Sequence, residues 1–311
     1  MPSQPAHHHL APFRLLPVFA ALAAVALWAS SFAVMKHLLM AGLPPLAIVW
    51  LRMIIAALLL APFFIFHRKG VCARPGDILW LLLLSLFEPG LYFLLEINAL
   101  QHTSSAQAGI IVATFPLLAA AGGALFFHEH LGARTIAGLA LAVGGAAVMT
   151  WGGEANAHAP NPWLGNTLEF LAILAAVGYM LIVKKLAARW PVWIITAFQM
   201  TFGAVFFLPG ALALAEPAAR EVLLHPRTLL LVLYLGAGIT VLAYGFYNYS
   251  ISRLSAARAG IIVNLLPVLA ALIGWWWLGE TLNGTQLLAA GGILAGVLLA
   301  QSGKDDAEER A

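Results

Sequence analysis

Ten long blocks of apolar residues constrain this chain more than any other feature of its sequence. Each block is about 20 residues long, which at a rise of 1.5 Å per residue matches the roughly 30 Å hydrocarbon core of a bilayer. Hydrophobic residues make up 62% of the chain and charged residues only 9%, a balance that excludes an ordinary soluble domain. We therefore predict ten membrane-spanning helices, at residues 14–36, 44–66, 78–99, 104–127, 133–151, 164–183, 192–214, 228–249, 256–278 and 284–301.

The length of these blocks decides the fold class. In lipid every backbone polar group must be satisfied internally, and blocks of this length suit helices rather than the alternating strands of about 10 residues found in outer-membrane barrels. The chain is predicted to be an all-α integral membrane protein. The first block is too long for the apolar part of a signal peptide and is expected to be retained.

The polar tails at 1–13 and 303–311 are expected to be disordered. Residues 152–163 are expected to form an outer loop between two units, 14–151 and 164–302.

The distribution of positive charge predicts the orientation. With the N-terminus inside, twelve of the 16 Lys and Arg residues are cytoplasmic, Lys36, Arg220 and Arg227 are outside, and Arg52 lies within a span. The positive-inside rule then places both termini in the cytoplasm. No basic cluster is dense enough to indicate nucleic-acid binding. The single cysteine, Cys72, excludes an internal disulfide.

An internal duplication relates the two halves of the chain. Residues 104–131 align without a gap on residues 255–282, with 14 identities in 28 positions that include Pro116 with Pro267 and Glu129 with Glu280. Each half has five spans, an odd number, so the second half must be inverted relative to the first. Inverted repeats offer two nearly equivalent packings, as alternating access requires, with the substrate site near the midplane between the halves. The alternative is a duplicated membrane scaffold without transport.

Several short motifs identify a family resemblance. They are LWASSF at 27–32, LR at 51–52, YFLLEINAL at 92–100 followed by TSSA at 103–106, and the stretch from Pro116 to Glu129-x-Leu131 with its second copy ending Glu280-x-Leu282. Together these motifs resemble the ten-helix EamA-type transporters of the drug/metabolite transporter (DMT) superfamily, over nearly the whole chain. The resemblance implies a secondary transporter that exports amino acids, other metabolites or toxic compounds.

Three ionisable residues at membrane depth are candidate functional groups, because charges there are costly. Glu88 is expected near the midplane, and Pro89 and Gly90 predict a kink beside it. It is a candidate for substrate binding or proton coupling, or else a carboxylate that is protonated or paired with Arg52. For Arg52 we favour that structural ion pair over substrate contact. Glu96 is expected near the outer interface, as a coupling carboxylate or a partly solvated structural one.

Other candidates are expected to line the same cavity with rings, hydroxyls and amides. Pockets for small solutes are mostly apolar with a few placed polar groups. The counterpart of the Glu88 region in the second half has no acid, so the cavity is expected to be chemically asymmetric. The full set of additional candidates is Trp28, Ser31, Tyr92, Asn98, Thr114, Tyr179, Thr240, Tyr244, Tyr247, Asn248 and Asn264.

Three further acids are interpreted as structural. Carboxylates favour helix N-termini, where free N–H groups carry positive character. Glu129 and Glu280 are therefore predicted to be symmetry-related caps just before the helices at 133–151 and 284–301. Glu169, one turn into its helix near the outer side, receives the same interpretation.

Three functions compete. The first is export of amino acids or similar metabolites from a bacterial inner membrane, with protons as candidate coupling ions through Glu88 or Glu96. The second is facilitated import or exchange on the same scaffold. An intramembrane enzyme would need a pattern such as His-Glu-x-x-His, whereas His128-Glu129-His130 lies at a helix end. We expect no metal or cofactor, partners limited to a small-molecule substrate, lipid and protons, no nucleic acid, and a monomer or homodimer.

Overall fold

The computed structural model describes residues 15–67, 74, 76–187, 189–251, 253–254 and 262–308, and within these residues the regular elements are all helices. The tail 1–13 and Cys72 lie outside the described residues. In chain order the elements are α1 (Leu15–Met40), α2 (Pro45–His67), α3 (Asp77–Ser85), the π-helical η1 (Leu86–Leu91), α4 (Tyr92–His102), α5 (Ser105–Val112), α6 (Phe115–Phe127), α7 (Ala133–Trp151), α8 (Pro162–Leu186), α9 (Val192–Phe206), α10 (Pro209–Ala213), α11 (Pro217–Leu224), α12 (Pro226–Leu233), η2 (Tyr234–Ala243), α13 (Tyr244–Ile251), α15 (Leu266–Ile273), η3 (Gly274–Leu278) and α16 (Gly284–Glu308).

Membrane-spanning helices account for most of the described chain. Two of the ten predicted spans, 192–214 and 256–278, coincide with the shorter apolar helices Val192–Phe206 and Leu266–Leu278. The predicted span 256–278 begins among residues 255–261, which lie outside the described residues. Residues 303–308, expected to be a disordered tail, continue α16 as a helix. The all-helical, multi-pass prediction is thereby confirmed, while the number ten stays a prediction. Eight stretches within the described residues are long and apolar enough to cross a membrane: Leu15–Met40, Pro45–Pro62, Asp77–His102, Ser105–Phe127, Ala133–Trp151, Pro162–Val183, Pro226–Ser250 and Gly284–Ser302.

Several predicted spans are interrupted rather than continuous. Glu88 has non-helical angles, φ −144° and ψ 117°, directly before Pro89. Proline lacks the N–H that would continue a helix, so the kink predicted here is confirmed. Breaks that the sequence analysis did not predict precede α6, where Pro116 lies in the first turn, and α10, which begins at Pro209.

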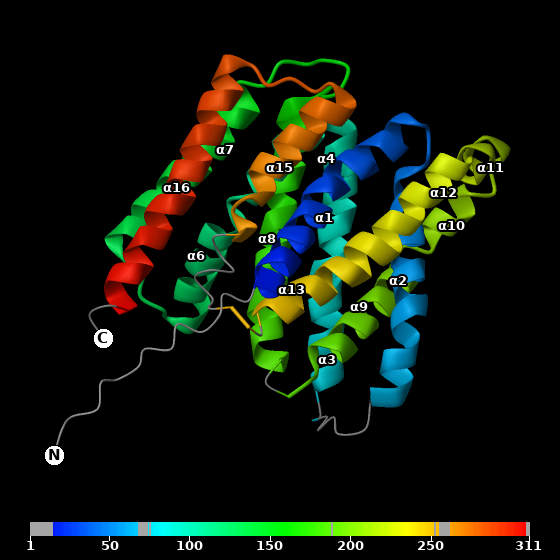
Figure 1. Cartoon of the computed structure of the whole chain (residues 1–311), viewed down its shortest axis with the longest axis horizontal. Coiled ribbons are helices and arrows are strands. Elements are labelled where there is room, and N and C mark those ends of the chain that lie inside the picture. The colour runs from blue at the N-terminus through cyan, green and yellow to red at the C-terminus, as the bar shows by residue number, and fades with distance from the viewer. Residues whose placement is uncertain are drawn as a thin grey trace, which may run out of the picture.

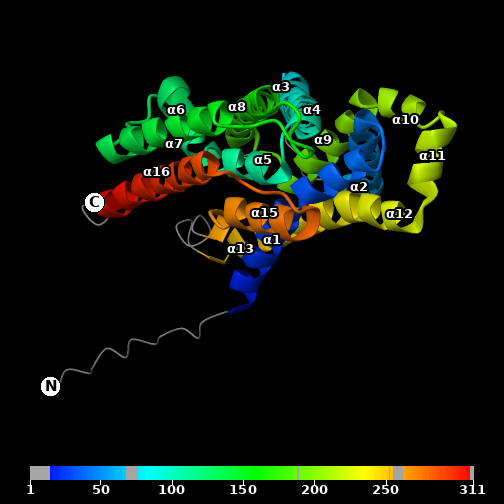
Figure 2. The same ribbon diagram turned by 90° about the horizontal axis from the view of Figure 1, so that it is seen from above.

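The helices pack as a bundle with α7 and α16 paired at one side and α10 to α12 at the other, an arrangement visible in both views (Figures 1 and 2). The largest buried apolar cluster joins helices of both halves, with Phe32 of α1, Met53 of α2 and Ile239 of η2 among its members. Helix α4 packs along α8, and α5 along α15. Residues far apart in the chain therefore meet in the middle of the molecule.

Glycine lets α7 and α16 approach closely. A Cβ added to Gly296 would lie 2.5 Å from the carbonyl oxygen of Gly138, whereas one added to Gly292 on the same helix would meet nothing within 4 Å. We expect Gly296→Ala to lower stability by about 1–3 kcal/mol through overpacking. The control, Gly292→Ala, should be neutral or slightly stabilising, since alanine favours helices. Thermal unfolding in detergent measures both, and equal melting temperatures would contradict this contact.

Candidate functional site

The break in the stretch Asp77–His102 presents Glu88 to the second half of the chain. Because Glu88 leaves the helical conformation, its backbone carbonyl is available, and it accepts a hydrogen bond of 2.7 Å from Nε2 of Gln199 on α9. The hydroxyl of Tyr244, the first residue of α13, lies 3.3 Å from Oε1 of Glu88 and donates to it. The second half thus holds Glu88 at two points, with Gln199 at its backbone carbonyl and Tyr244 at its half-buried carboxylate.

Arg52 does not form the predicted ion pair with Glu88. Its side chain is 5% exposed, and its Nε donates to Oγ1 of Thr240 at 2.8 Å. The guanidinium carbon lies 4.3 Å from the centre of the Phe93 ring, a cation–π contact. Its charge reaches Glu88 and Glu96 only through longer-range electrostatics. The prediction failed because Thr240, a neutral partner on η2, could not be placed beside Arg52 from the sequence.

Aromatic side chains from both halves gather around Glu88. The ring of Trp28 on α1 lies 5.5 Å from that of Tyr244, edge to face, and 5.1 Å from that of Tyr247. Tyr179 on α8 interacts electrostatically with Glu88 and through its hydroxyl with Gln199. All four rings are half-buried. These candidates from distant parts of the sequence form one constellation.

A second group of acids consists of Glu96 on α4, about two turns beyond Glu88, and Glu169 on α8. The hydroxyl of Tyr92 donates to Oε1 of Glu96 at 2.9 Å. Glu96 is 2% exposed, so of the two alternatives for this residue the partly solvated structural carboxylate is wrong. Glu169 on α8, interpreted from the sequence as an ordinary helix-start carboxylate, is fully buried and interacts electrostatically with Glu96. The tight packing of α8 against α4 explains both corrections.

The remaining candidates bond within their own neighbourhood. Ser31 donates to the Trp28 carbonyl, Asn98 to the Leu94 carbonyl and Thr114 to the Ile111 carbonyl, each one turn earlier in the chain. The structure places Asn248, half-buried, on α13 beside Tyr247. Nδ2 of Asn264 donates to Gln301 on α16 at 2.8 Å.

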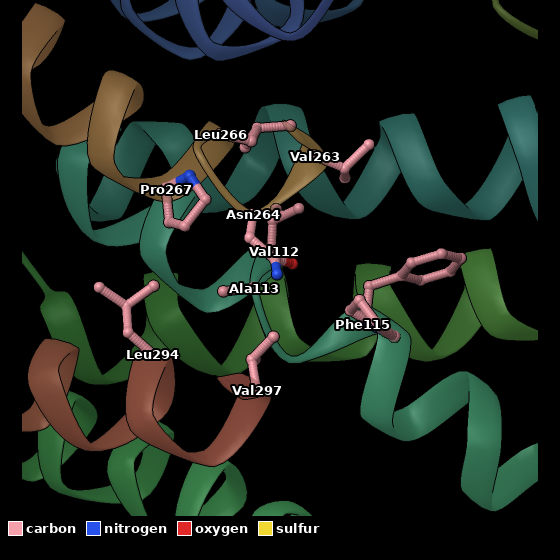
Figure 3. Close-up of a pocket in the computed structure, with 10 residues that line it drawn as sticks. Val112, Ala113, Phe115, Val263, Asn264, Leu266, Pro267, Leu294 and Val297 are labelled. Atoms are coloured by element: carbon pink, nitrogen blue, oxygen red, sulfur yellow. The ribbon is translucent and has the colours of Figure 1, made fainter. Parts of the chain in front are cut away.

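Asn264 also lines a small cavity beside the breaks that precede α6 and α15, at residues 113–114 and 264–265. In Figure 3 it lies beside Val112 and Ala113, with Pro267 and Leu294 nearby. The cavity holds about 50 Å³, enough for water but well below the roughly 300 Å³ of a metabolite pocket. Within the described residues no group of three or more His, Cys, Asp or Glu could hold a metal ion.

Glu280 is a helix cap, but of a different helix from the one predicted. Its carboxylate accepts three hydrogen bonds at the start of α5, from the N–H of Ser105 (2.8 Å), the hydroxyl of Ser105 (2.8 Å) and the N–H of Ala106 (2.9 Å). The helix at 284–308 is instead capped by Asn283 and Gln286, which bond each other's N–H groups at 2.9 Å. The pattern Asn-x-x-Gln is a capping box, the sequence signal that would have found this cap.

Glu129 repeats the local conformation of Glu280. Both follow a residue with positive φ, His128 (55°) and Gly279 (69°), and both carboxylates lie against a glycine six residues earlier, Gly123 or Gly274, where a Cβ would collide. The helix that Glu129 was predicted to cap, α7, has Gly132 as its N-cap residue and no side-chain cap. The duplication therefore extends to backbone geometry.

Lys36 is a buried residue that the sequence analysis placed outside. Helix α1 continues to Met40, and the Lys36 side chain is 3% exposed. Its ammonium donates to the carbonyls of Leu100 (2.6 Å) and Thr103 (2.9 Å) at the end of α4. A cation there complements the negative end of the helix dipole.

Comparison with known proteins agrees with this architecture. A model of the EamA-like transporter family matches residues 15–151 and again 163–301. Similar proteins include the uncharacterized inner membrane transporter YedA of Escherichia coli (29% identity; 94% of this chain and 92% of that one) and the uncharacterized transporter YetK of Bacillus subtilis (26%; 90% and 86%). A probable terminal-alkyne amino-acid exporter of Streptantibioticus cattleyicolor is 27% identical over 64% of each chain.

A solved crystal structure of a protein has the same fold, with a TM-score of 0.57 and 20% identity over 91% of this chain and 96% of that one. The family model covers nearly all of the chain in two consecutive copies, and the relatives are named transporters. The chain therefore belongs to the EamA-like transporter family of the DMT superfamily and is a multi-pass membrane transporter of small molecules.

Proposed function

We propose that this protein is a ten-span secondary transporter of a bacterial inner membrane that exports amino acids or related small metabolites by alternating access. The observation that carries the proposal is the Glu88 carboxylate at a helix break, faced by Tyr244 from the second half. A charge at membrane depth is costly to keep and is by default functional, and broken helices are where transporters bind substrates.

The chemistry of the constellation suits an amino acid with an apolar or aromatic side chain. The Glu88 carboxylate would accept hydrogen bonds from the substrate ammonium, a charge-assisted interaction. Tyr244 holds that carboxylate in place through its hydroxyl. The rings of Trp28 and Tyr247, 5.1 Å apart, offer flat apolar surface for the rest of the substrate.

Arg52 has a positioning role in this proposal. Its bond to Thr240 joins α2 of the first half to η2 of the second. Its positive charge interacts with Glu88 and Glu96 and reduces the cost of holding carboxylates inside the membrane. In this proposal Glu88 and the rings of Trp28 and Tyr247 contact the substrate, and Arg52 does not.

The proposed topology follows from the duplication. Units 14–151 and 164–302 have five spans each, so they lie inverted about the midplane with both termini in the cytoplasm. Two relatives support the location and the substrate class, one named as an inner membrane transporter and one as a probable amino-acid exporter. The proposed binding constellation combines Trp28 of the first unit with Tyr244 and Tyr247 of the second.

Proteoliposomes test this function directly. Liposomes loaded with radiolabelled amino acids and containing the purified protein should release one chemical class of them faster than protein-free liposomes when an opposing proton gradient is imposed. Amino-acid flux that does not respond to the proton gradient and appears only as counterflow would instead indicate a facilitative importer or exchanger. If no amino acid moves, and metabolite profiles of cells with and without the gene are identical, the export proposal is wrong.

A further inference from the structure

The interface between α4 and α8 contains carboxylate oxygens without hydrogen-bond partners. Both oxygens of Glu169 and Oε2 of Glu96 are buried, and none has a partner within the described part of the chain. The Tyr92 hydroxyl, 2.9 Å from Oε1 of Glu96, provides the hydrogen bond that the structure shows for this pair of acids. Buried polar atoms are almost always hydrogen-bonded, so three unsatisfied oxygens in one place require an explanation.

The two carboxylates cannot both be charged at this position. Glu169 is fully buried, Glu96 is 2% exposed, and they interact electrostatically across the packed faces of α4 and α8. Each ionised carboxylate away from water costs several kcal/mol, and two adjacent negative charges repel. A single proton removes one of the two charges and with it the repulsion, as in other pairs of neighbouring carboxyl groups of which only one ionises.

Few other ionisable groups face this pair. Tyr92 of α4, Glu88 of η1 and Arg52 of α2 interact electrostatically with one or both acids or with their hydrogen-bond donor. On α1, the Lys36 ammonium is engaged by carbonyls at the end of α4. One Arg52 charge cannot neutralise three carboxylates, so at least part of the remaining negative charge must be removed by protonation.

The remaining helices that pack on α8 bring no counter-charge near the pair. Helices α5 and α6 have no ionisable residue. The ionisable residue of α7 is Arg134, which lies in the first turn, at the end of the helix away from Glu169. On α3, Asp77 pairs with Arg189 beyond the far end of α8. On α4 itself the remaining titratable residue is His102, in the last turn of the helix. Arg52 is thus the cation that interacts with Glu96, and a proton must remove the second charge of the pair.

We propose that Glu96 and Glu169 together bind one exchangeable proton, and that this proton is the ion exchanged for the exported substrate. The inference rests on the proposed export function and names its coupling site. In each cycle one proton enters the pair from outside and leaves to the cytoplasm, while one substrate leaves the cell. Tyr92 interacts with both acids of the pair and with Glu88, and thus connects the proton site to the proposed substrate site.

A polar network lies one turn from Glu169, toward the start of α8 and the end of α4. Asn166, one turn before Glu169 on α8, is buried and donates to Oε1 of Gln107 on α5 at 3.0 Å. The Thr103 hydroxyl, at the end of α4, bonds both of these amides. The pair thus lies between a polar network on one side and Tyr92 on the other.

The first test measures proton binding without any substrate. Infrared difference spectra of the reconstituted protein should show a protonated carboxylic acid that titrates with pH. In Glu96→Gln and in Glu169→Gln the midpoint should shift by about one pH unit or more, because each variant removes the interacting acid. The control Glu154→Gln, at an exposed loop position, should match the wild type. An unchanged midpoint in both pair variants, or a response to Na⁺ at constant pH, would overturn the proposal.

The second test measures coupling in proteoliposomes loaded with radiolabelled amino acids. In both pair variants the stimulation of amino-acid efflux by a proton gradient should be about tenfold smaller than in the wild type. Both variants should retain counterflow at equal pH, which also shows that they are folded. Glu169→Asp, which keeps a carboxylate, should retain part of the stimulation. If the wild type moves no amino acid, the export function fails while the titration still stands. If the wild type is gradient-driven and both variants are too, the coupling site is wrong.

Discussion

Glu88→Gln is expected to raise the half-saturating concentration of an amino-acid substrate about 10- to 100-fold. The substitution keeps the size and one carbonyl oxygen of the side chain but removes the charge that would pair with the substrate ammonium. A hydrogen bond to a charged group contributes about 1.5–3 kcal/mol, and each 1.4 kcal/mol corresponds to a factor of ten in affinity. Concentration-dependent counterflow in proteoliposomes measures this change.

Two matched variants sharpen this test. Glu154→Gln removes the same charge at an exposed loop position and should leave transport unchanged. Tyr244→Phe removes only the hydroxyl that lies 3.3 Å from Glu88 and should have a smaller effect than Glu88→Gln. Normal half-saturation in Glu88→Gln would show that Glu88 does not touch the substrate, and that the break beside Pro89 is structural.

Glu280→Ala is expected to destabilise the protein by about 3 kcal/mol. The carboxylate accepts three hydrogen bonds at the buried start of α5, and alanine would leave the N–H groups of Ser105 and Ala106 without an acceptor. Loss of an N-cap costs about 0.5–2 kcal/mol, and hydrogen bonds to charged groups contribute about 1.5–3 kcal/mol each. Thermal unfolding of the purified protein in detergent measures the loss.

A comparison within the same segment separates this cap from an ordinary one. Gln286→Ala breaks the capping box at the start of α16 and should cost about 1 kcal/mol. Gly274→Ala should resemble Glu280→Ala, since its Cβ would collide with the Glu280 carboxylate. Equal melting temperatures for Glu280→Ala and Gln286→Ala would contradict the assignment of Glu280 to α5.

The features that the sequence predicted correctly have local causes. Apolar blocks long enough to span a bilayer require helices whatever surrounds them, and the comparisons confirm the family that the short motifs indicated. The kink at Glu88 was predictable because Pro89 removes a hydrogen bond within its own helix. Orientation, the count of ten spans and the roles of the site residues stay predictions.

The interactions of the buried charged residues could not be predicted from the sequence in the same way. The partners of Arg52, Glu96 and Glu169 depend on how α2, α4 and α8 are rotated about their axes and which neighbours they face. Successive residues of a helix point about 100° apart, so a block that is apolar all round does not reveal which face is buried. Glu280 shows the same limit, because its partners are 174 and 175 residues away.

Composition and local motifs alone thus established a helical membrane transporter with a broken helix at Glu88. The partners of its ionisable side chains, including the electrostatic interaction of Glu96 with Glu169, arose from helix packing. The physical reason is range: hydrophobic length and proline act within a few residues, whereas the pairing of buried charges is decided by contacts between segments far apart in the chain.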